Sequence, residues 1–297
     1  RMLGMDNKII DGKLISAQIL EEVKSEVIGL EKTSGLVPGL TVILVGEDPA
    51  SKVYVGSKER KAGEVGMRGQ TINFPSESSE RDVIEVIETL NEDDSCHGIL
   101  VQLPLPNHID ENQIISSINP LKDVDGLHPY NMGLLASGSP RFVPATPGGI
   151  KEMMIRSDIT LKGKHVAVIG RSNIVGRPLS NLLSLKGEGG DATVTICHSQ
   201  TQNLIEICRS ADVIIAAIGT PNYITGDMVS EGIIAIDVGI NRVEDSQKRR
   251  GYRLVGDIEF DTVVKKAVAI TPVPGGVGPM TIAMLLSNTL FAAKLSL

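Results

Sequence analysis

The stretch that decides the fold is HVAVIGRSNIVGRP, residues 165–178, which has the pattern of a buried strand, a glycine turn and the start of a helix. Backbone amides at a helix N-terminus are unsatisfied donors at the positive end of the helix dipole, and they suit a pyrophosphate. Glycines stand at positions 170 and 176, and Ser172 occupies the place where the usual G-x-G-x-x-G fingerprint has a second glycine. Taken alone, the stretch is also compatible with a generic strand-to-helix turn.

Strand and helix patterns alternate on both sides of this stretch. Such alternation is typical of parallel sheets with crossover helices, and the order after residue 164 is that of a doubly wound nucleotide-binding fold. The segment VEDSQKRRGYR, residues 243–253, is expected to be a solvated hairpin loop. Predicted helices span residues 14–32, 80–93, 150–158, 176–186, 201–211 and 281–295, with a further helix around residues 51–61, and predicted strands span residues 38–46, 68–75, 96–106, 164–170, 192–199, 212–219 and 232–240.

The pattern predicts an α/β protein of two three-layer domains, the second with a Rossmann-like doubly wound parallel sheet. A chain of 297 residues is long enough for two cores. A boundary is expected at RFVPATPGGI, residues 141–150, and a second punctuated segment, residues 271–281, precedes a final helix that we expect to return to the first domain. The expected domains are residues 5–145 with 278–297 and residues 146–277, and we interpret residues 1–4 as a cloning remnant before a native start at Met5.

Composition excludes several classes of partner. A formal net charge of −7 leaves no basic excess to neutralise phosphates, which argues against nucleic acid and anionic membranes. Among the longest apolar runs is VIIAAIG, residues 213–219, far short of the ~20 residues that a membrane helix needs. The three cysteines are too few and too scattered for a disulfide framework or a zinc site, so a reducing, cytoplasmic location is expected. No metal is predicted, because the histidines at 97, 108, 128 and 165 lack ligand spacing.

The end of the second strand of the nucleotide-binding domain indicates which dinucleotide is bound. An NAD site places an acidic residue there to accept hydrogen bonds from the ribose 2′-hydroxyl. This chain has His198 and Ser199 instead, with Arg171 in the first turn. A guanidinium and a hydroxyl can hold a 2′-phosphate that a carboxylate would repel, so NADP is favoured over NAD. Considered one at a time, each residue also fits another role: Arg171 fits a surface ion pair, and His198 fits a purely structural role.

The first domain carries an unusual pair, Tyr54 and Lys58, in the segment SKVYVGSKERKAGEVGM, residues 51–67. Residues four positions apart lie on the same helix face, so a lysine can reach whatever the phenol ring covers. The alternative is a solvated basic face, since further lysines and arginines crowd the segment. The whole chain has only four tyrosines and four phenylalanines, which makes an exposed aromatic more informative.

Six motifs together resemble the bifunctional methylenetetrahydrofolate dehydrogenase/methenyltetrahydrofolate cyclohydrolase family. They are YVGSK at 54–58, GILVQLPLP at 98–106, KDVDGLHPYN at 122–131, TPGG at 146–149, GRSNIVGRP at 170–178 and PVPGGVGPMT at 272–281. The resemblance implies a folate site in a cleft between the two domains. It implies Lys58 as the catalytic base, Gln102 as the residue that orients it, Tyr54 stacked on the folate and Asp125 bound to the pterin. Asp123 is expected to support the loop.

The same resemblance extends to the rest of both binding sites. Buried beside a cationic substrate, a lysine ammonium is disfavoured, and Lys58 can then act as a base near neutral pH. The implied substrate-binding residues are Tyr54, Gln102, Leu103, Asp125, Pro274, Gly275 and Gly278. The implied NADP-binding residues are Thr146, Gly170, Arg171, Ser172, Ile174, Val175, Gly176, Pro178, His198, Ser199, Ala217, Gly219, Gly239, Ile240 and Thr281.

The resemblance implies two consecutive reactions at one site. NADP-dependent oxidation of 5,10-methylenetetrahydrofolate gives the methenyl compound, and hydrolysis of that compound gives 10-formyltetrahydrofolate. A cytoplasmic homodimer serving one-carbon metabolism and purine biosynthesis is also implied. Two alternatives are a monofunctional NAD-dependent dehydrogenase, which would lack the lysine and carry an acid after the second strand, and a non-catalytic NADP-binding module, which would have a degenerate first domain.

Overall fold

The computed structural model describes residues 8–248 and 251–297, without the side chains of residues 49 and 50. The expected remnant at residues 1–4 and the start at Met5 lie outside the described residues. The chain forms two compact units that interleave along the sequence. Unit 1 contains residues up to Ser16 together with Thr146–Thr281, and unit 2 contains Ala17–Ala145 together with Ile282–Leu297.

Unit 1 is built on a five-stranded parallel sheet with the order β10-β7-β6-β4-β5. Counted from β4, the order is 2-1-3-4-5, so the chain reverses direction across the sheet between β4 and β6, as in a doubly wound fold. The predicted Rossmann-like parallel sheet is therefore confirmed. The elements are α6 (Ala145–Arg156), β4 (His165–Ile169), α7 (Gly176–Ser184), β5 (Thr193–Cys197), α8 (Leu204–Ser210), β6 (Val213–Ala216), η2 (Gly226–Met228), β7 (Ile234–Asp237), β8 (Asn241–Glu244), β9 (Tyr252–Val255), α9 (Phe260–Val263) and β10 (Ala269–Ile270).

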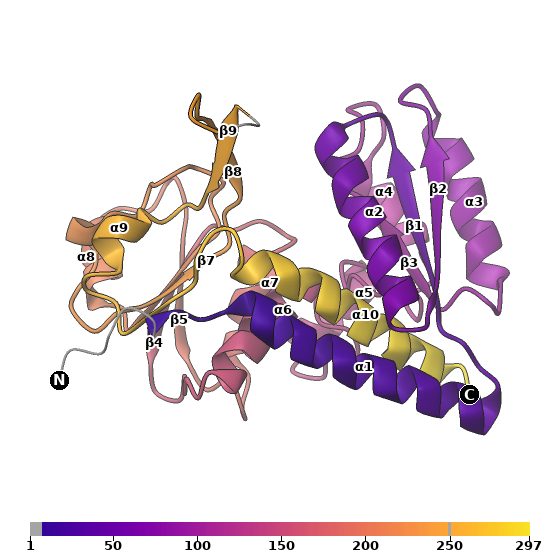
Figure 1. Cartoon of the computed structure of the whole chain (residues 1–297), viewed down its shortest axis with the longest axis horizontal. Helices are drawn as coiled ribbons and strands as arrows, with labels where there is room; N and C mark the ends of the chain where they lie inside the picture. The colour runs from indigo at the N-terminus through magenta and orange to yellow at the C-terminus, as the bar shows by residue number, and fades with distance from the viewer. Residues whose placement is uncertain (1–7, 249–250) are drawn as a thin grey trace. The chain divides into compact units, whose positions relative to one another are not determined.

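Burial explains why the central strands of this sheet contain few polar residues. A parallel sheet covered on both faces needs continuous apolar runs, and β6 is buried at all four residues. Edge strand β5, by contrast, is buried at Cys197 and exposed at Thr193 and Ile196. The predicted hairpin is confirmed, because β8 and β9 pair antiparallel and extend away from the sheet of their unit (Figure 1).

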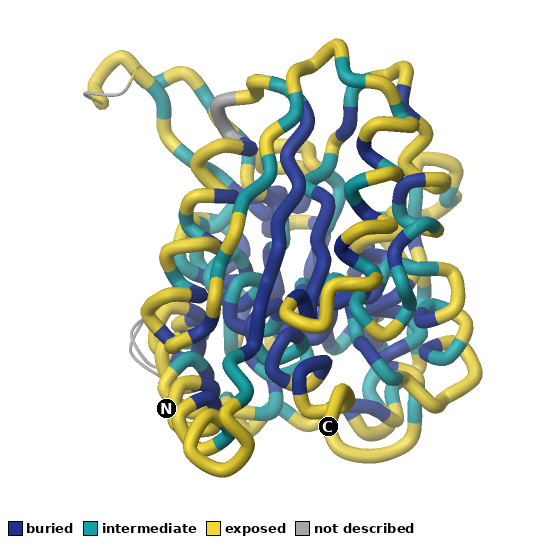
Figure 2. The backbone as a smooth tube through the Cα atoms, turned by 90° about the vertical axis from the view of Figure 1, so that its right-hand side faces the viewer, coloured by how far each residue is buried: buried dark blue, intermediate teal, exposed yellow. Residues whose placement is uncertain are grey.

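Unit 2 is built on a three-stranded parallel sheet with the order β2-β1-β3. Strands β1 and β3 are buried along their length, whereas edge strand β2 is partly exposed (Figure 2). Alternate residues of β1 face opposite sides, and the side that carries Ile43 and Val45 packs against Ile87 of α3 and Ile114 of α4. The elements are β1 (Gly39–Val45), α2 (Pro49–Glu64), β2 (Arg68–Phe74), α3 (Glu80–Glu92), β3 (Gly98–Val101), α4 (Glu111–Ser117) and α5 (Pro129–Ala136).

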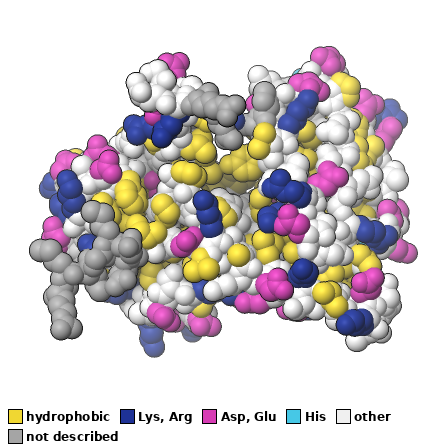
Figure 3. Space-filling model, viewed as in Figure 1, with side chains coloured by type: hydrophobic (Ala, Val, Ile, Leu, Met, Phe, Trp, Pro, Cys, Tyr) yellow, Lys and Arg dark blue, Asp and Glu magenta, His cyan; other side chains and the backbone are white. Residues whose placement is uncertain are grey.

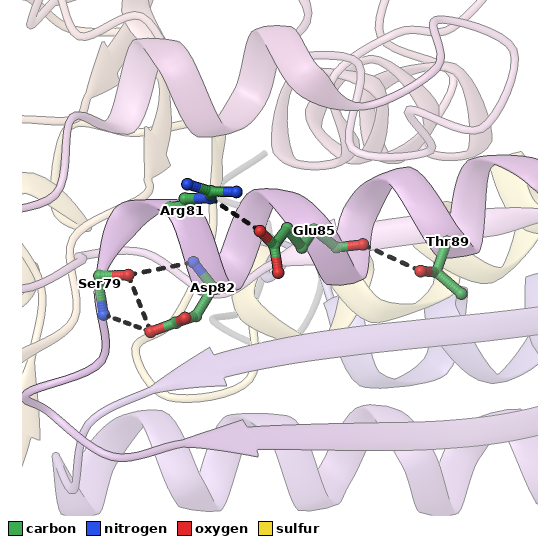
Figure 4. A network of polar contacts seen from close by, with 5 residues as sticks. All are labelled: Ser79, Arg81, Asp82, Glu85 and Thr89. Carbon is green, nitrogen blue, oxygen red and sulfur yellow. Dashed lines mark hydrogen bonds and ion pairs between the residues drawn. The ribbon is translucent and has the colours of Figure 1, made fainter.

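Helix α3 shows how local sequence fixes a helix in unit 2. Ser79 and Asp82 form a capping box, in which the Ser79 hydroxyl accepts from the Asp82 amide and the Asp82 carboxylate accepts from the Ser79 amide (Figure 4). Arg81, which lies between these two residues in the sequence, pairs with Glu85 one turn along the helix at 2.8 Å on the solvent face. Such a box is worth about 1 kcal/mol of helix stability.

Two helices, α1 (Gly12–Ser34) and α10 (Val277–Leu295), together with α6, contain the boundaries between the units. The proline- and glycine-rich boundary predicted at residues 141–150 is not a loop throughout, because α6 already begins at Ala145. Likewise α10 begins at Val277, so Gly278 lies in its first turn. Proline and glycine are tolerated there because first-turn amides have no intrahelical acceptor.

The surface is mixed in charge. On the face drawn in Figure 3, Lys and Arg side chains are interspersed with Asp and Glu side chains over both units. None of the described helices is both long and apolar enough to span a bilayer.

Candidate active site

Lys58 is a buried lysine on the core-facing side of α2. It shares that side with Val55 and Ala62, which are 3% and 0% exposed, and is itself only 7% exposed. Positions i, i+3 and i+7 form one stripe of a helix, so the lysine replaces an apolar residue in that stripe. The alternative of a solvated basic face is therefore wrong for Lys58.

The acceptor for Lys58 is Gln102, the residue that follows β3. The Lys58 Nζ donates to Gln102 Oε1 at 2.9 Å, and the Gln102 amide Nε2 donates to the carbonyl of Leu103 at 2.7 Å. The Gln102 backbone amide also donates to Ile43 of β1, which extends the sheet by one residue. These bonds fix the amide so that its oxygen faces the lysine.

Burial changes the pKa values of Lys58 and of Asp125. Removal from water lowers the pKa of Lys58, and the negative charge of Asp125 offsets part of that effect. Removal from water also raises the pKa of Asp125 to about 6, with Lys58 opposing the rise and Asp123 adding to it. A lysine can act as a base near neutral pH only if its ammonium form is disfavoured, and the burial of Lys58 has this effect.

Residues with no predicted catalytic role hold the loop that carries Asp125. Asp123 is 1% exposed and accepts bonds from the backbone amides of Leu127 and His128 and from the Asn131 side chain. The predicted supporting role of Asp123 is thus confirmed. From α10, Asn288 donates to the carbonyls of Val124 and Val143, at 2.8 and 2.9 Å.

Tyr54 lies one helical turn before Lys58 and is 42% exposed. An exposed aromatic ring next to a buried lysine offers a flat surface for a ligand that the lysine can reach. Unit 2 therefore gathers Lys58, Gln102 and Leu103 by direct hydrogen bonds, links Asp125 to Lys58 by charge, and places Tyr54 on the same helix as Lys58.

In unit 1 many of the predicted cofactor residues lie just after the carboxyl ends of the strands, where doubly wound sheets bind their ligands. Gly170 follows β4 and Ala217 follows β6, on either side of the point where the strand order reverses. A Cβ on Gly170 would lie 2.2 Å from the Ala217 carbonyl oxygen, and a Cβ on Gly176 would lie 2.1 Å from the Gly170 carbonyl oxygen. Only glycine allows this close backbone approach, and the cradle it forms fits a pyrophosphate.

The amides at the start of α7 are not all unsatisfied, which corrects the sequence argument. The Ser172 hydroxyl accepts from the amides of Val175 and Gly176 at 3.2 and 3.4 Å, and the Ser172 carbonyl accepts from Arg177. Both hydroxyl contacts are long for hydrogen bonds, and a charged phosphate oxygen is a stronger acceptor than a hydroxyl. Ile174 near this turn is 46% exposed, whereas Val175 and Pro178 are buried.

The three residues predicted to read the 2′-phosphate follow neighbouring strands. Ile169 of β4 is paired with Cys197 of β5, so Arg171 and the pair His198–Ser199 leave the sheet side by side. Arg171 and Ser199 are exposed. His198 Nδ1 accepts from the Gln200 amide, which leaves the proton on Nε2.

Four of the remaining predicted residues of unit 1 form two close pairs. The hydroxyls of Thr146 and Thr281 lie 2.9 Å apart. A Cβ on Gly278 would lie 3.3 Å from Ile240. In the segment before α10 the Gly275 carbonyl accepts from the Lys13 amide, and the Val273–Pro274 peptide is cis. Pro274, Gly275 and Gly278 thus belong to unit 1, whereas the other predicted substrate-binding residues belong to unit 2.

Two buried aspartates of unit 1 were not among the predicted site residues. Asp237 ends β7 and is 4% exposed, and Asp257 follows β9 and is 0% exposed. Removal from water raises the pKa of Asp237 to about 7, against the bonds that it accepts from the amides of Ile258, Asp257 and Gly239. Their signal was present in the repeated pairing of aspartate with glycine, DVG at 237–239 and VGD at 255–257. Across the described residues, no three His, Cys, Asp or Glu side chains are grouped to hold a metal ion.

Comparison with known proteins matches both parts of the chain to one family. Residues 10–125 match the tetrahydrofolate dehydrogenase/cyclohydrolase catalytic domain, and residues 144–297 match the NAD(P)-binding domain of the same family. A protein of Chlorobium phaeobacteroides strain BS1 named bifunctional protein FolD is 55% identical over 284 residues, which covers 95% of each chain.

Two solved structures are similar over nearly the whole chain. The bifunctional FolD methylenetetrahydrofolate dehydrogenase/cyclohydrolase of Campylobacter jejuni has 47% identity and a TM-score of 0.91, covering 97% of this chain and 99% of that one. The Trypanosoma brucei N5,N10-methylenetetrahydrofolate dehydrogenase-cyclohydrolase, complexed with NADP cofactor and inhibitor, has 41% identity and a TM-score of 0.91, covering 97% of each chain.

Proposed function

Since the chain belongs to the tetrahydrofolate dehydrogenase/cyclohydrolase family, we propose an assignment of its two activities to named residues. It is an NADP-dependent methylenetetrahydrofolate dehydrogenase and a methenyltetrahydrofolate cyclohydrolase, rather than a monofunctional dehydrogenase. It oxidises 5,10-methylenetetrahydrofolate to the methenyl compound and hydrolyses that compound to 10-formyltetrahydrofolate.

Lys58 is the general base of the hydrolysis. The observation that carries this role is the buried Nζ, 2.9 Å from Gln102 Oε1, with its pKa lowered by burial. Water attacks the cationic methenyl carbon and gives a proton to the neutral Nζ. The resulting ammonium donates a proton to the ring nitrogen N5 as the carbon–N5 bond breaks, while the remaining hydroxyl proton leaves to solvent and the formyl group stays on N10. Proton transfer by a positioned base contributes about 10²- to 10⁴-fold to a rate.

Tyr54 and Asp125 bind the folate. Stacking on the exposed Tyr54 ring holds the reacting carbon near Lys58 and favours a cationic ring. Asp125 accepts paired N–H bonds from the pterin 2-amino group and ring nitrogen. With a pKa of about 6, its carboxyl is mostly ionised at neutral pH and competent to accept them. Leu103 contributes the backbone that fixes Gln102, and Pro274, Gly275 and Gly278 are the further folate-binding residues.

The residues of unit 1 bind NADP, which supplies the acceptor carbon for the hydride. Gly170 and Gly176 provide the cradle for the pyrophosphate, with Ser172 and Val175 beside it. Arg171, His198 and Ser199 bind the 2′-phosphate. Hydride transfer depends on position more than on acid–base help, and the residues that fix the rest of the cofactor are Thr146, Ile174, Pro178, Ala217, Gly219, Gly239, Ile240 and Thr281.

One assay tests this assignment. Purified protein is mixed with 5,10-methylenetetrahydrofolate and either NADP or NAD, and reduced cofactor and methenyl compound are followed separately by absorbance. We expect reduction mainly with NADP, and clearance of the methenyl compound faster than in protein-free buffer. Reduction without enzymatic clearance would contradict the role of Lys58. Absence of reduction with either cofactor would contradict the dehydrogenase assignment.

We further propose the assembly and setting of the protein. Most of the folate-binding residues belong to the domain of residues 5–145 with 278–297, and most of the NADP-binding residues belong to the domain of residues 146–277, in a cytoplasmic enzyme that supplies 10-formyltetrahydrofolate for purine biosynthesis. A homodimer through the NADP-binding domains is supported by edge strand β5, which pairs only with β4 and exposes Ile196. Light scattering on the wild type and Ile196→Asp tests it, with a dimer expected for the wild type and a monomer for the variant.

A further inference from the structure

The two buried aspartates of unit 1 form a chain of hydrogen bonds that ends on the loop after β6. Asp237 Oδ1 accepts from the amides of Gly239 and Asp257 at 3.0 and 2.9 Å, and its Oδ2 accepts from Ile258 at 2.8 Å. Asp237 therefore holds the backbone of Asp257 in place. The same bonds tie the turn after β7 to the segment after β9.

The Asp257 carboxylate in turn accepts hydrogen bonds from the loop after β6 and from Asn241. Its Oδ2 accepts from the amides of Ile218 and Gly219 at 2.6 and 2.9 Å, and its Oδ1 accepts from the Asn241 side chain at 2.9 Å. One side chain thus holds both the loop after β6 and the start of β8. Gly219 has a φ of +74°, so its backbone is in the region that favours glycine.

Two glycines make room for the carboxylates. A Cβ on Gly239 would lie 2.2 Å from Asp257 Oδ1, and a Cβ on Gly256 would lie 1.8 Å from Asp237 Oδ2. The fit is reciprocal, because each aspartate lies against a glycine next to the other aspartate. Asp257 is 0% exposed and Asp237 is 4% exposed, so these carboxylates depend on the loop amides and on Asn241 for hydrogen-bond donors.

The loops held in this way lie at the ligand-binding edge of the sheet. Strand β6 borders the point where the strand order reverses, and Ala217, directly before the held amides, packs on Gly170. We propose that Asp257, held by Asp237, is a positioning residue for NADP that acts through the amides of Ile218 and Gly219. This inference rests on the proposed function, in which Gly219, Gly239 and Ile240 bind the cofactor.

Four variants test the inference. Asp257→Ala leaves the loop amides without an acceptor. Asp257→Asn retains one oxygen for these amides and turns an NH₂ group toward Asn241, whose amide can flip to accept it. Asn241→Asp places a second carboxylate against Asp257, and the double variant Asp257→Asn/Asn241→Asp restores a donor facing an acceptor.

The readouts separate positioning from general loss of structure. The Kd for NADP is measured by calorimetry, the KM and kcat of the dehydrogenase by absorbance, and the cyclohydrolase rate without NADP serves as the internal control. Unsatisfied or opposed buried polar groups cost enough to raise Kd and KM about tenfold to a hundredfold in Asp257→Ala and Asn241→Asp. We expect near wild-type Kd in Asp257→Asn and in the double variant, and near wild-type hydrolysis in all four.

Several results would overturn the inference. An unchanged Kd for NADP in Asn241→Asp is one, and a defect in Asn241→Asp that Asp257→Asn does not relieve is another. These two variants decide the question even if Asp257→Ala does not fold. A wild-type protein that fails to bind NADP would instead overturn the cofactor assignment on which the inference rests.

Discussion

Replacing Lys58 by methionine should separate the two activities. Methionine has a similar length and no charge, so it fills the same space in the buried stripe of α2. Loss of a positioned base should lower the cyclohydrolase rate about 10²- to 10⁴-fold, which corresponds to about 3–5 kcal/mol in the barrier. The dehydrogenase should keep appreciable activity, because hydride transfer needs no base.

The fold should tolerate this replacement. Lys58 is 7% exposed and its pKa is lowered, so the folded protein already disfavours the ammonium. Methionine removes that cost and loses the bond to Gln102, which is worth about 1 kcal/mol. The two effects oppose one another, and thermal unfolding should remain cooperative with a similar midpoint.

The assay compares the wild type, Lys58→Met and Lys61→Met, and each of the two reactions is measured separately. Clearance of methenyltetrahydrofolate is followed without NADP, and reduction of NADP is followed with methylenetetrahydrofolate. The control is Lys61→Met, because Lys61 lies on the same helix, pairs with Glu64 at 2.6 Å and is not a predicted site residue. Equal loss of both activities in Lys58→Met, or hydrolysis at the wild-type rate, would refute the division of roles.

Three further outcomes are expected. Gln102→Glu places a carboxylate beside Lys58 and raises its pKa, so the pH–rate profile of the cyclohydrolase should move to higher pH; an unmoved profile would count against the Lys58 base. Arg171→Ala should reduce the NADP-over-NAD preference in kcat/KM about tenfold to a hundredfold, since a bond to a charged group is lost, and an unchanged preference would exclude Arg171 from the 2′-phosphate site. The pKa of Asp237 is raised to about 7 in the folded protein, so its contribution to stability is present at low pH and is lost as pH rises to about 7. Asp237→Asn should therefore flatten the fall in melting temperature between about pH 4 and pH 7, and a fall as steep as in the wild type would contradict the raised pKa.

Much of the fold was predictable because it depends on periodicity. The buried strands around Val168 and Ile215 are short apolar runs. Helix α3 is predicted by apolar residues at helical spacing that follow a capping serine. Helices α4 and α5, of seven and eight residues, were not predicted, because so few turns give no clear period. The starts of α6 and α10 were also missed, since glycine and proline indicate a turn although a first helical turn accepts both.

The candidate site was predictable to a different extent. Lys58, Gln102 and Asp125 lie in motifs, and the family resemblance carried their roles, but spacing alone did not reveal that Lys58 is buried. Burial depends on what packs over α2, which is tertiary information. The pair Asp237 and Asp257 escaped notice because each carboxylate bonds mainly to backbone amides from distant segments, and the short Asp–Gly patterns around them do not reveal those contacts.

The interleaving of the two units has a consequence for synthesis on the ribosome. Asn288, which holds the carbonyl of Val124 beside Asp125, is made 164 positions after its partner. The first large segment of unit 2 therefore emerges long before the helix that completes it, and all of Thr146–Thr281 emerges in between. Nascent chains usually fold one domain after another from the N-terminus. In this protein the loop that carries Asp125 must wait for α10, so this loop is completed only after most of that helix has been made.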